Sequence, residues 1–377
     1  MSLEGEIVVR IDWDGRRVND VRICSTRTHA ASRLLVGRTA DDVGSIVPLL
    51  YSVCAGAHAA AASAALAAAA ADDLGPIDLE TASIDVVLEA VGEHVKSLLI
   101  DWPRALDRQP NPSPVAQAWR HVEAMQRDSR AGRVVVADAG ALESIAAEFI
   151  YGMASTKWLR IESIAGLQAW LDEASVEPAL CVGVLLRDYA ALGASDVLPM
   201  PVVSSATLHH PLAASLANAA EFECRPTWNG AAVETGVLPR MQSVPLVSAV
   251  VASFGNGVIA RFVARLTELA TLLQRFAARP SVPWPAVEVC TDTTGAGVAA
   301  VQTARGLLLH RARVEGGRVT AYRIVAPTEW NFHPDGPLAN GLRRCTARDE
   351  EDLGRRAAVA IQALDPCVAT RIEVGHA

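Results

Sequence analysis

Two cysteines near opposite ends of the chain stand where metal-binding cysteine pairs usually occur, each without its partner. Cys54 directly precedes an alanine-rich segment, and Cys367 follows Asp365 and Pro366 near the end of the chain. Thiolate sulfur is a soft ligand that suits iron, nickel and zinc. The alanine-rich segment predicts a helix beginning just after Cys54, and the N–H groups and dipole at a helix N-terminus favour the thiolate. A metal held by two distant thiolates is one prediction, and a pair of plain buried cysteines is the alternative.

The segments that must position these cysteines are mostly helical, with a β-hairpin near each end. β-rich runs flank Asp14-Gly15 and Gly316-Gly317, and such pairs are typical of hairpin turns. Apolar residues spaced three and four apart predict helices, the clearest of them amphipathic over 259–276. The proline-rich stretch 103–114 is the best candidate for a loop or a sub-boundary. Strands are predicted at 7–13, 18–23, 306–314 and 318–325, and helices at 58–71, 83–100, 115–127, 141–151, 164–173, 259–276 and 349–364.

Composition limits the partners of the chain. Of its 377 residues, 51% are hydrophobic and 20% charged, which predicts a large buried core. The net charge of -8 argues against nonspecific binding to nucleic acid or to an anionic membrane, because both need a basic surface. The longest apolar run is nearly all alanine and glycine and is too weakly apolar to span a bilayer. The first residues lack the features of a signal peptide, so a cytoplasmic location is expected.

Five short motifs resemble those of the large subunit of nickel-iron hydrogenases, and together they extend over nearly the whole chain. In that family two cysteine pairs hold the nickel-iron centre. Tyr51 stands here in place of the first cysteine of the first pair, and Thr370 in place of the second cysteine of the last pair. The resemblance implies that Cys54 and Cys367 remain as metal ligands and that half of the thiolates are lost. The motifs are Leu34-Leu35-Val36-Gly37-Arg38, 233–240, Thr303-Ala304-Arg305-Gly306-Leu307 with His310, 326–338 and Asp365-Pro366-Cys367.

The same resemblance implies that the groups that recognise the iron's cyanide ligands are kept. Arg305 matches the arginine that lies over the cyanides, and Pro327 and Thr328 match the loop that hydrogen-bonds the other cyanide. His58 matches a histidine of the cofactor pocket. Charged and hydroxyl donors suit a metal-bound cyanide, which is a strong acceptor. We therefore expect Cys54 and Cys367 close together, with Arg305 pointing into the same cavity without an acidic partner.

The magnesium-binding positions of the family are not kept, since Ala31-Ser32 and Glu373 replace its glutamate and its terminal histidine. A four-thiolate pocket binds nickel tightly, whereas two thiolates suit an iron that is already capped by cyanide and carbonyl. The iron side is therefore expected to be kept and the nickel side lost.

The chain is most similar to hydrogenase accessory proteins of the HupK/HoxV type, which resemble a truncated large subunit. This implies an α+β fold, in which a central bundle of long helices is flanked by small sheets, and one domain over 1–377. It also implies a non-catalytic scaffold for an Fe(CN)2CO unit, without nickel. The implied partners are a maturation chaperone complex of the HypC/HypD type and the hydrogenase large subunit. Three alternatives stay open: a metal-free mimic that binds the chaperones, a degenerate hydrogenase, and a quinone-reductase-type subunit.

Overall fold

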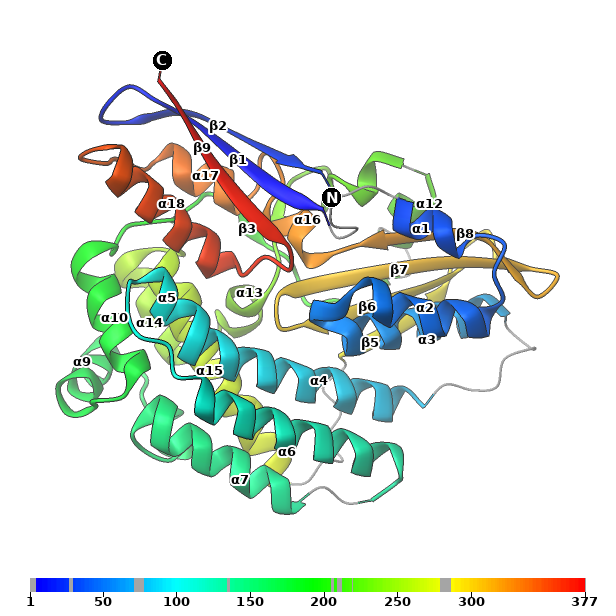
Figure 1. Cartoon of the computed structure of the whole chain (residues 1–377), viewed down its shortest axis with the longest axis horizontal. Helices are drawn as coiled ribbons and strands as arrows, with labels where there is room; N and C mark the ends of the chain where they lie inside the picture. The colour runs from blue at the N-terminus through cyan, green and yellow to red at the C-terminus, as the bar shows by residue number, and fades with distance from the viewer. Residues whose placement is uncertain are drawn as a thin grey trace.

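The computed structural model describes residues 5–26, 30–70, 78–133, 136–204, 207–208, 212–218, 220–278 and 286–376. Figure 1 shows two small sheets along one side of the molecule and long helices along the other. This is the predicted α+β arrangement. No helix of the described residues is long and apolar enough to cross a membrane. Glu4, which the sequence places in a motif resembling the start of the hydrogenase subunit, lies outside the described residues.

The first sheet joins the two ends of the chain. Strands β1 (Glu6–Trp13) and β2 (Val18–Ser25) form the predicted hairpin. Strand β9 (Ala369–His376), which the sequence analysis did not predict, pairs in parallel with β1, so that Thr370 lies opposite Ile7. The order is β2-β1-β9, and this pairing fixes the segment that carries Cys367 beside the N-terminal strand.

The second sheet is an antiparallel meander in the order β5-β6-β7-β8. Its strands are β5 (Val287–Thr291), β6 (Gly297–Thr303), β7 (Gly306–Glu315) and β8 (Arg318–Val325), and a short parallel pair is formed by β3 (Leu198–Pro199) and β4 (Val233–Glu234). The hairpin of β7 and β8 confirms the prediction. The alanine-rich helix α3 (Ala55–Ala70) packs very closely on β6, since a Cβ added at Gly297 would lie 1.9 Å from the Ala65 oxygen. Small residues on both elements permit this approach.

The helices α4 (Leu79–Lys96) and α15 (Val258–Ala278) cross the centre of the molecule (Figure 1). The others are α1 (Ala30–Leu35), α2 (Ala40–Leu50), α5 (Trp102–Ala105), α6 (Pro112–Arg130), α7 (Val136–Ala146), α8 (Ser155–Trp158), α9 (Ile164–Glu173), α10 (Glu177–Asp188), α12 (Ala213–Asn218), α13 (Val237–Met241), α14 (Pro245–Phe254), α16 (Pro327–Asn331), α17 (Pro337–Arg343) and α18 (Glu350–Leu364). Shorter turns are η1 (Ser52–Cys54), η2 (Ser97–Asp101), η3 (Ala147–Tyr151) and η5 (Ala220–Glu223).

Two expectations from the sequence need correction here. The stretch 103–114 is a loop only over 106–111. On one side α4 continues through the π-helical turn η2 into α5, on the other α6 begins at Pro112, and the Asn111 N–H donates to the Leu99 carbonyl at 2.9 Å. Helix α15 is buried on both faces, because Arg261, Arg265 and Glu268 are all buried and ion-paired. The spacing of apolar residues along the helix could not show whether its charged side chains are solvated or are paired inside the protein.

Candidate functional site

Cys54 lies at the end of η1, where the chain enters α3, and is 7% exposed. The Arg305 guanidinium donates from Nη1 to the Cys54 sulfur at 3.3 Å. Burial raises the pKa of the Cys54 thiol well above its usual value, although the charge of Arg305 acts in the opposite direction. Without a metal, Cys54 is therefore a thiol held against a cation.

The expectation that the start of α3 stabilises a Cys54 thiolate is wrong, because a buried carboxylate already occupies that helix end. Glu89 of α4 accepts the N–H of Gly56 at 2.6 Å and the N–H of Ala57 at 3.3 Å. Burial raises the pKa of Glu89 to about 7. A Cβ added at Gly56 would lie 2.5 Å from the Glu89 carboxylate, so glycine is needed for this contact. Glu89 therefore fixes the first turn of α3 behind Cys54.

A double-mutant cycle tests this contact. Glu89→Ala removes the acceptor for two N–H groups, and Gly56→Ala displaces it, so each is expected to lower the free energy of unfolding by about 1–2 kcal/mol. Because both changes break the same interaction, the free energy of unfolding of the double variant should be little lower than that of either single variant. The measurement is urea unfolding of the four proteins at pH 7. Strictly additive costs would show that Gly56 and Glu89 act independently.

Arg305 lies in the tight turn between β6 and β7, and several groups hold its backbone. Its N–H donates to the Thr303 hydroxyl at 3.1 Å, and Asn331 donates to its carbonyl oxygen at 3.2 Å. Gly306, with φ +135°, makes the turn possible, and a Cβ there would clash with Thr235. The side chain is 4% exposed and faces the site, as expected.

The expectation that Arg305 lacks an acidic partner is wrong. Its Nη2 donates to Glu93 at 2.7 Å, and its Nε lies 3.3 Å from Asp365. That second contact is an ion pair without hydrogen-bond alignment, so Nε is a buried polar atom with no hydrogen-bond partner among the described residues. The two carboxylates compensate the cost of burying the guanidinium.

Cys367 follows helix α18, whose last cap is Asp365 in the left-handed conformation at φ 49°. Its N–H donates to the Thr328 hydroxyl at 3.3 Å, and that oxygen lies 2.9 Å from the Cys367 sulfur. Because the hydroxyl accepts from the backbone, its own hydrogen can be donated to the sulfur. Thr328 is buried in the first turn of α16, directly after Pro327, so the predicted loop does lie beside a predicted ligand.

The two predicted metal ligands are neighbours across Arg305. Cys367 packs against the apolar cluster that contains Cys54. Both sulfur atoms lie near enough to Arg305 to interact with it electrostatically. A cleft of about 640 Å³ opens beside them, with Arg305, Asp365, Cys367 and Thr370 in its lining. No group of three or more His, Cys, Asp or Glu within the described ranges could hold a metal ion by itself. The two thiols stand on either side of Arg305, with Cys54 in contact with its guanidinium and Cys367 in the lining of the cleft.

His58 takes part in a separate buried hydrogen-bonded chain. Its Nδ1 lies 3.0 Å from Nε2 of His310, whose Nδ1 lies 2.7 Å from the Tyr322 hydroxyl. Burial lowers the pKa of His310 to about 3, so this ring is neutral at pH 7. Tyr51 stacks flat on His58, with ring centroids 4.0 Å apart. Tyr51, in the place of a missing cysteine, therefore stacks on the histidine that the resemblance assigned to the cofactor pocket, but neither residue belongs to the cleft lining described above.

A buried network supports Asp365 from behind. Arg265 donates to Asp365 at 2.8 Å, and burial, which alone would raise the pKa of Asp365, is outweighed by Arg305 and Arg265, which lower it. His94 is fully buried, with its Nδ1 3.4 Å from Arg265 and its Nε2 2.8 Å from Glu268. These contacts hold the Asp365 carboxylate in place beside Arg305.

The remaining cysteines lie away from this cleft. Cys24 and Cys224 line a second cavity of about 280 Å³, together with Tyr51. Cys181, Cys290 and Cys345 are buried, and burial raises the pKa of each thiol. None of the five contributes to the cleft lining described above.

Comparison with known proteins shows what this chain is similar to. The model of the nickel-dependent hydrogenase family matches residues 282–372, which contain Arg305, Thr328 and Cys367. The hydrogenase expression/formation protein HoxV of Cupriavidus necator is 31% identical, over 93% of this chain and 92% of that protein. The chain belongs to the HoxV/HupK family. HupK of Bradyrhizobium diazoefficiens is 30% identical over 100% of this chain and 99% of that protein.

Comparison with solved structures shows that this HoxV/HupK family member has the fold of a hydrogenase large subunit. The Ni-Fe-Se hydrogenase from D. vulgaris Hildenborough in its as-isolated oxidized state matches with a TM-score of 0.55 at 16% identity, over 94% of each chain. The reduced, active Ni-Fe-Se hydrogenase from Desulfomicrobium baculatum matches with a TM-score of 0.54 at 13% identity, over 95% of each chain. At these identities the likeness establishes the fold alone. The names of the family members indicate an accessory role in hydrogenase maturation.

Proposed function

We propose that this protein carries the Fe(CN)2CO unit on Cys54 and Cys367 and passes it to the large subunit of a nickel-iron hydrogenase. The observation that carries the proposal is the Arg305 contact with Cys54 at 3.3 Å, at the side of a cleft that Cys367 also lines. Two thiols and a guanidinium converge there from three distant parts of the chain. The role is binding and delivery without turnover.

The donors around the cleft suit this substrate. An iron that already carries cyanide and carbonyl needs few protein ligands, and two thiols are available. The Arg305 guanidinium, which contacts Cys54, is a charged donor, and a metal-bound cyanide is a good acceptor for such a donor. The loop of Pro327 and Thr328 adds a hydroxyl next to Cys367. The site offers nickel no comparable set of soft ligands, because the side chains of Tyr51 and Thr370 contain no sulfur.

Infrared spectroscopy of anaerobically purified protein tests the proposal. Protein from cells that make hydrogenase should show cyanide and carbonyl stretching bands and contain iron, with little nickel. Cys54→Ser and Cys367→Ser should each lower the intensity of these bands at least tenfold, because one thiolate then remains for the iron. Cys290→Ser, a buried cysteine outside the cleft, is the matched control and should leave the bands unchanged. Folded wild-type protein without such bands would instead support the metal-free mimic.

The proposed partners follow from this role. Delivery requires a donor that builds the iron unit, for which a chaperone complex of the HypC/HypD type is the candidate, and an acceptor, which is the large subunit. If the partners bind through the iron unit, each should copurify with the wild-type protein and be lost when Cys54 and Cys367 are replaced by serine. A metal-free mimic that binds the chaperones through its surface would still copurify with them after both cysteines are replaced.

A further inference from the structure

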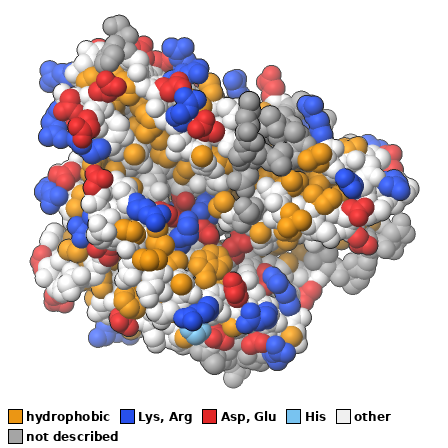
Figure 2. All heavy atoms as spheres, viewed as in Figure 1, with side chains coloured by type: hydrophobic (Ala, Val, Ile, Leu, Met, Phe, Trp, Pro, Cys, Tyr) orange, Lys and Arg blue, Asp and Glu red, His pale blue; other side chains and the backbone are white. Residues whose placement is uncertain are grey.

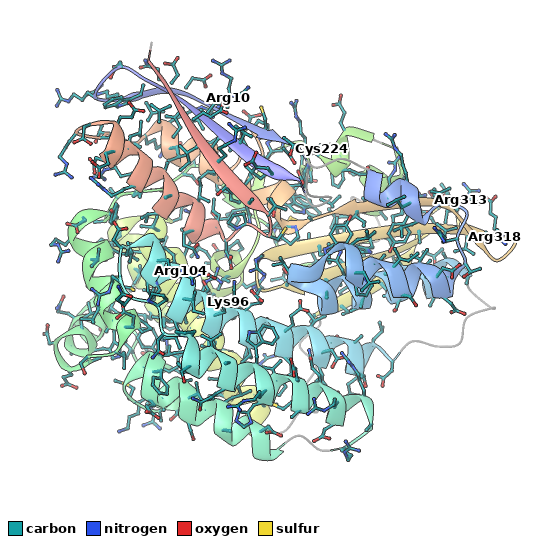
Figure 3. The ribbon with its side chains drawn as sticks, in the orientation of Figure 1. Arg10, Lys96, Arg104, Cys224, Arg313 and Arg318 are labelled. Carbon is teal, nitrogen blue, oxygen red and sulfur yellow. The ribbon has the colours of Figure 1, made fainter. Side chains whose placement is uncertain are left out.

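The cleft beside Cys367 opens on the surface between two separate parts of the fold. One side is formed by α4, η2 and α5, and the other by the end of α18 and the first half of β9. Figure 2 shows a hollow in the middle of this face with lysine and arginine side chains at its edge. Figure 3 labels two of them, Lys96 at the end of α4 and Arg104 on α5. Both line the cleft on the same side.

Charge is distributed unevenly in this cleft. Lys96 is held by Asp101 at 2.9 Å and lies 3.8 Å from Glu93. Glu93 in turn pairs with Arg305, so Lys96 continues the ion pairs of the metal site outward to the surface. Arg104 is exposed, and none of the carboxylates of the described residues pairs with it.

The lining as a whole has an excess of positive charge. The lining contains three cationic and two anionic side chains. One of the two carboxylates, that of Asp365, is also paired with Arg265, which does not line the cleft. The charged lining residues are Lys96, Arg104 and Arg305 against Asp101 and Asp365. This is notable in a chain whose net charge is -8. The uncompensated cation at the opening is Arg104.

We propose that Arg104, assisted by Lys96, forms an anion-recognition site at the mouth of the cleft that receives cyanide-bearing iron complexes before the thiols bind them. This rests on the proposed function. An iron cyanide complex directs acceptor nitrogen atoms outward, and the Fe(CN)2CO unit of iron(II) is anionic while donor thiolates are still bound to it. A cation at the opening therefore attracts the unit as it is handed over and donates to its cyanides. The rest of the lining is largely apolar, including Val53, Ile361 and Val368, and would not attract an anion.

The cleft is also large enough for this step. Pockets of 300–1,000 Å³ hold drug-sized ligands, and a volume of about 640 Å³ therefore exceeds what an iron with three diatomic ligands needs. The extra space permits the complex to bind first near Arg104 and then move to Cys367 and Arg305. Recognition at the mouth and coordination by sulfur are thus two separable steps.

Hexacyanoferrate(II) is a suitable probe, because it exchanges its ligands very slowly and reports anion recognition without sulfur coordination. Titration calorimetry should detect binding to wild-type protein at low salt, weakened several-fold when the ionic strength is raised to 0.3 M. Arg104→Glu should weaken binding at least tenfold, and Arg104→Ala several-fold. Arg313→Glu changes the net charge equally on an exposed arginine of β7, labelled in Figure 3, and should leave binding unchanged.

The outcomes separate this inference from the proposed function. The double variant Cys54→Ser, Cys367→Ser should keep hexacyanoferrate binding while losing the infrared bands of the iron unit. Hexacyanoferrate affinity that is equal in wild type, Arg104→Glu and Arg313→Glu would overturn the anion site and leave the carrier proposal standing. Arg104-dependent binding in a protein that never acquires the iron unit would overturn the carrier proposal alone. Slower gain of the bands by Arg104→Glu than by Arg313→Glu would support the two-step order.

Discussion

Arg305→Lys is expected to give a folded protein that holds less than a tenth of the wild-type iron unit. The guanidinium uses its planar shape to reach Cys54, Glu93 and Asp365 on different sides at once. An ammonium keeps the charge but cannot reproduce this fork, so it can pair with a carboxylate only by giving up the contact with the Cys54 sulfur. The measurement is iron content and cyanide band intensity, with urea unfolding as the test of folding.

The choice of lysine matters because of the two buried carboxylates. Arg305→Leu would leave Glu93 and Asp365 without their shared partner, and removing one member of a buried ion pair costs about 3–5 kcal/mol. Loss of iron in that variant could reflect an altered fold. Arg261→Lys is the matched control, because Arg261 is equally buried and pairs with Glu234 outside the cleft. An Arg305→Lys protein that keeps full iron occupancy would remove Arg305 from the binding site.

The double variant Tyr51→Cys, Thr370→Cys is expected to gain nickel. Thr370 lines the cleft with Cys367, so a thiol there would stand beside an existing ligand. Two added thiolates complete a soft four-sulfur set, and nickel binds such sites more tightly than iron does. Tyr51 also stacks on His58, so its replacement removes a ring that is held in place. We expect at least tenfold more nickel per protein than in wild type.

The single variants are the controls for this gain. Each adds one thiolate and should give a much smaller increase in nickel than the double variant. Metal analysis of anaerobically purified proteins, together with hydrogenase activity of the cells, is the measurement. We expect activity to fall in the double variant, because iron would be released less readily. Equal nickel in all four proteins, with maturation unchanged, would mean that the missing thiols do not separate the carrier from the enzyme.

Sequence motifs indicated the proposed ligands but not the groups that hold them. Cys54, Cys367, Arg305 and Thr328 were identified from short motifs, and the structure brings them together. Glu93 was missed, because a glutamate in a helical pattern is usually solvated. Its partner Arg305 is 212 residues away in sequence, and no local pattern reports such a pair.

Glu89 illustrates the same limit and its consequence for the chemistry. The position of Cys54 before a helix correctly indicated α3, yet the predicted stabilisation of its thiolate failed because Glu89 from another helix occupies the N–H groups. A usable signal was present, since Gly56 interrupts an alanine-rich helix and an isolated glycine can mark a close approach. Strand β9 was missed because its alternating pattern is short and its partner β1 lies at the other end of the chain.

Transfer of a labelled iron unit tests the central claim most directly. The protein would be isolated anaerobically with ¹³C-labelled cyanide on its iron, mixed with unlabelled large-subunit precursor and separated again, and the infrared spectrum of each recorded. We predict that the isotope-shifted bands leave this protein and appear on the large subunit. Labelled bands that stay on this protein while the precursor acquires an unlabelled unit from the chaperone complex would contradict the account.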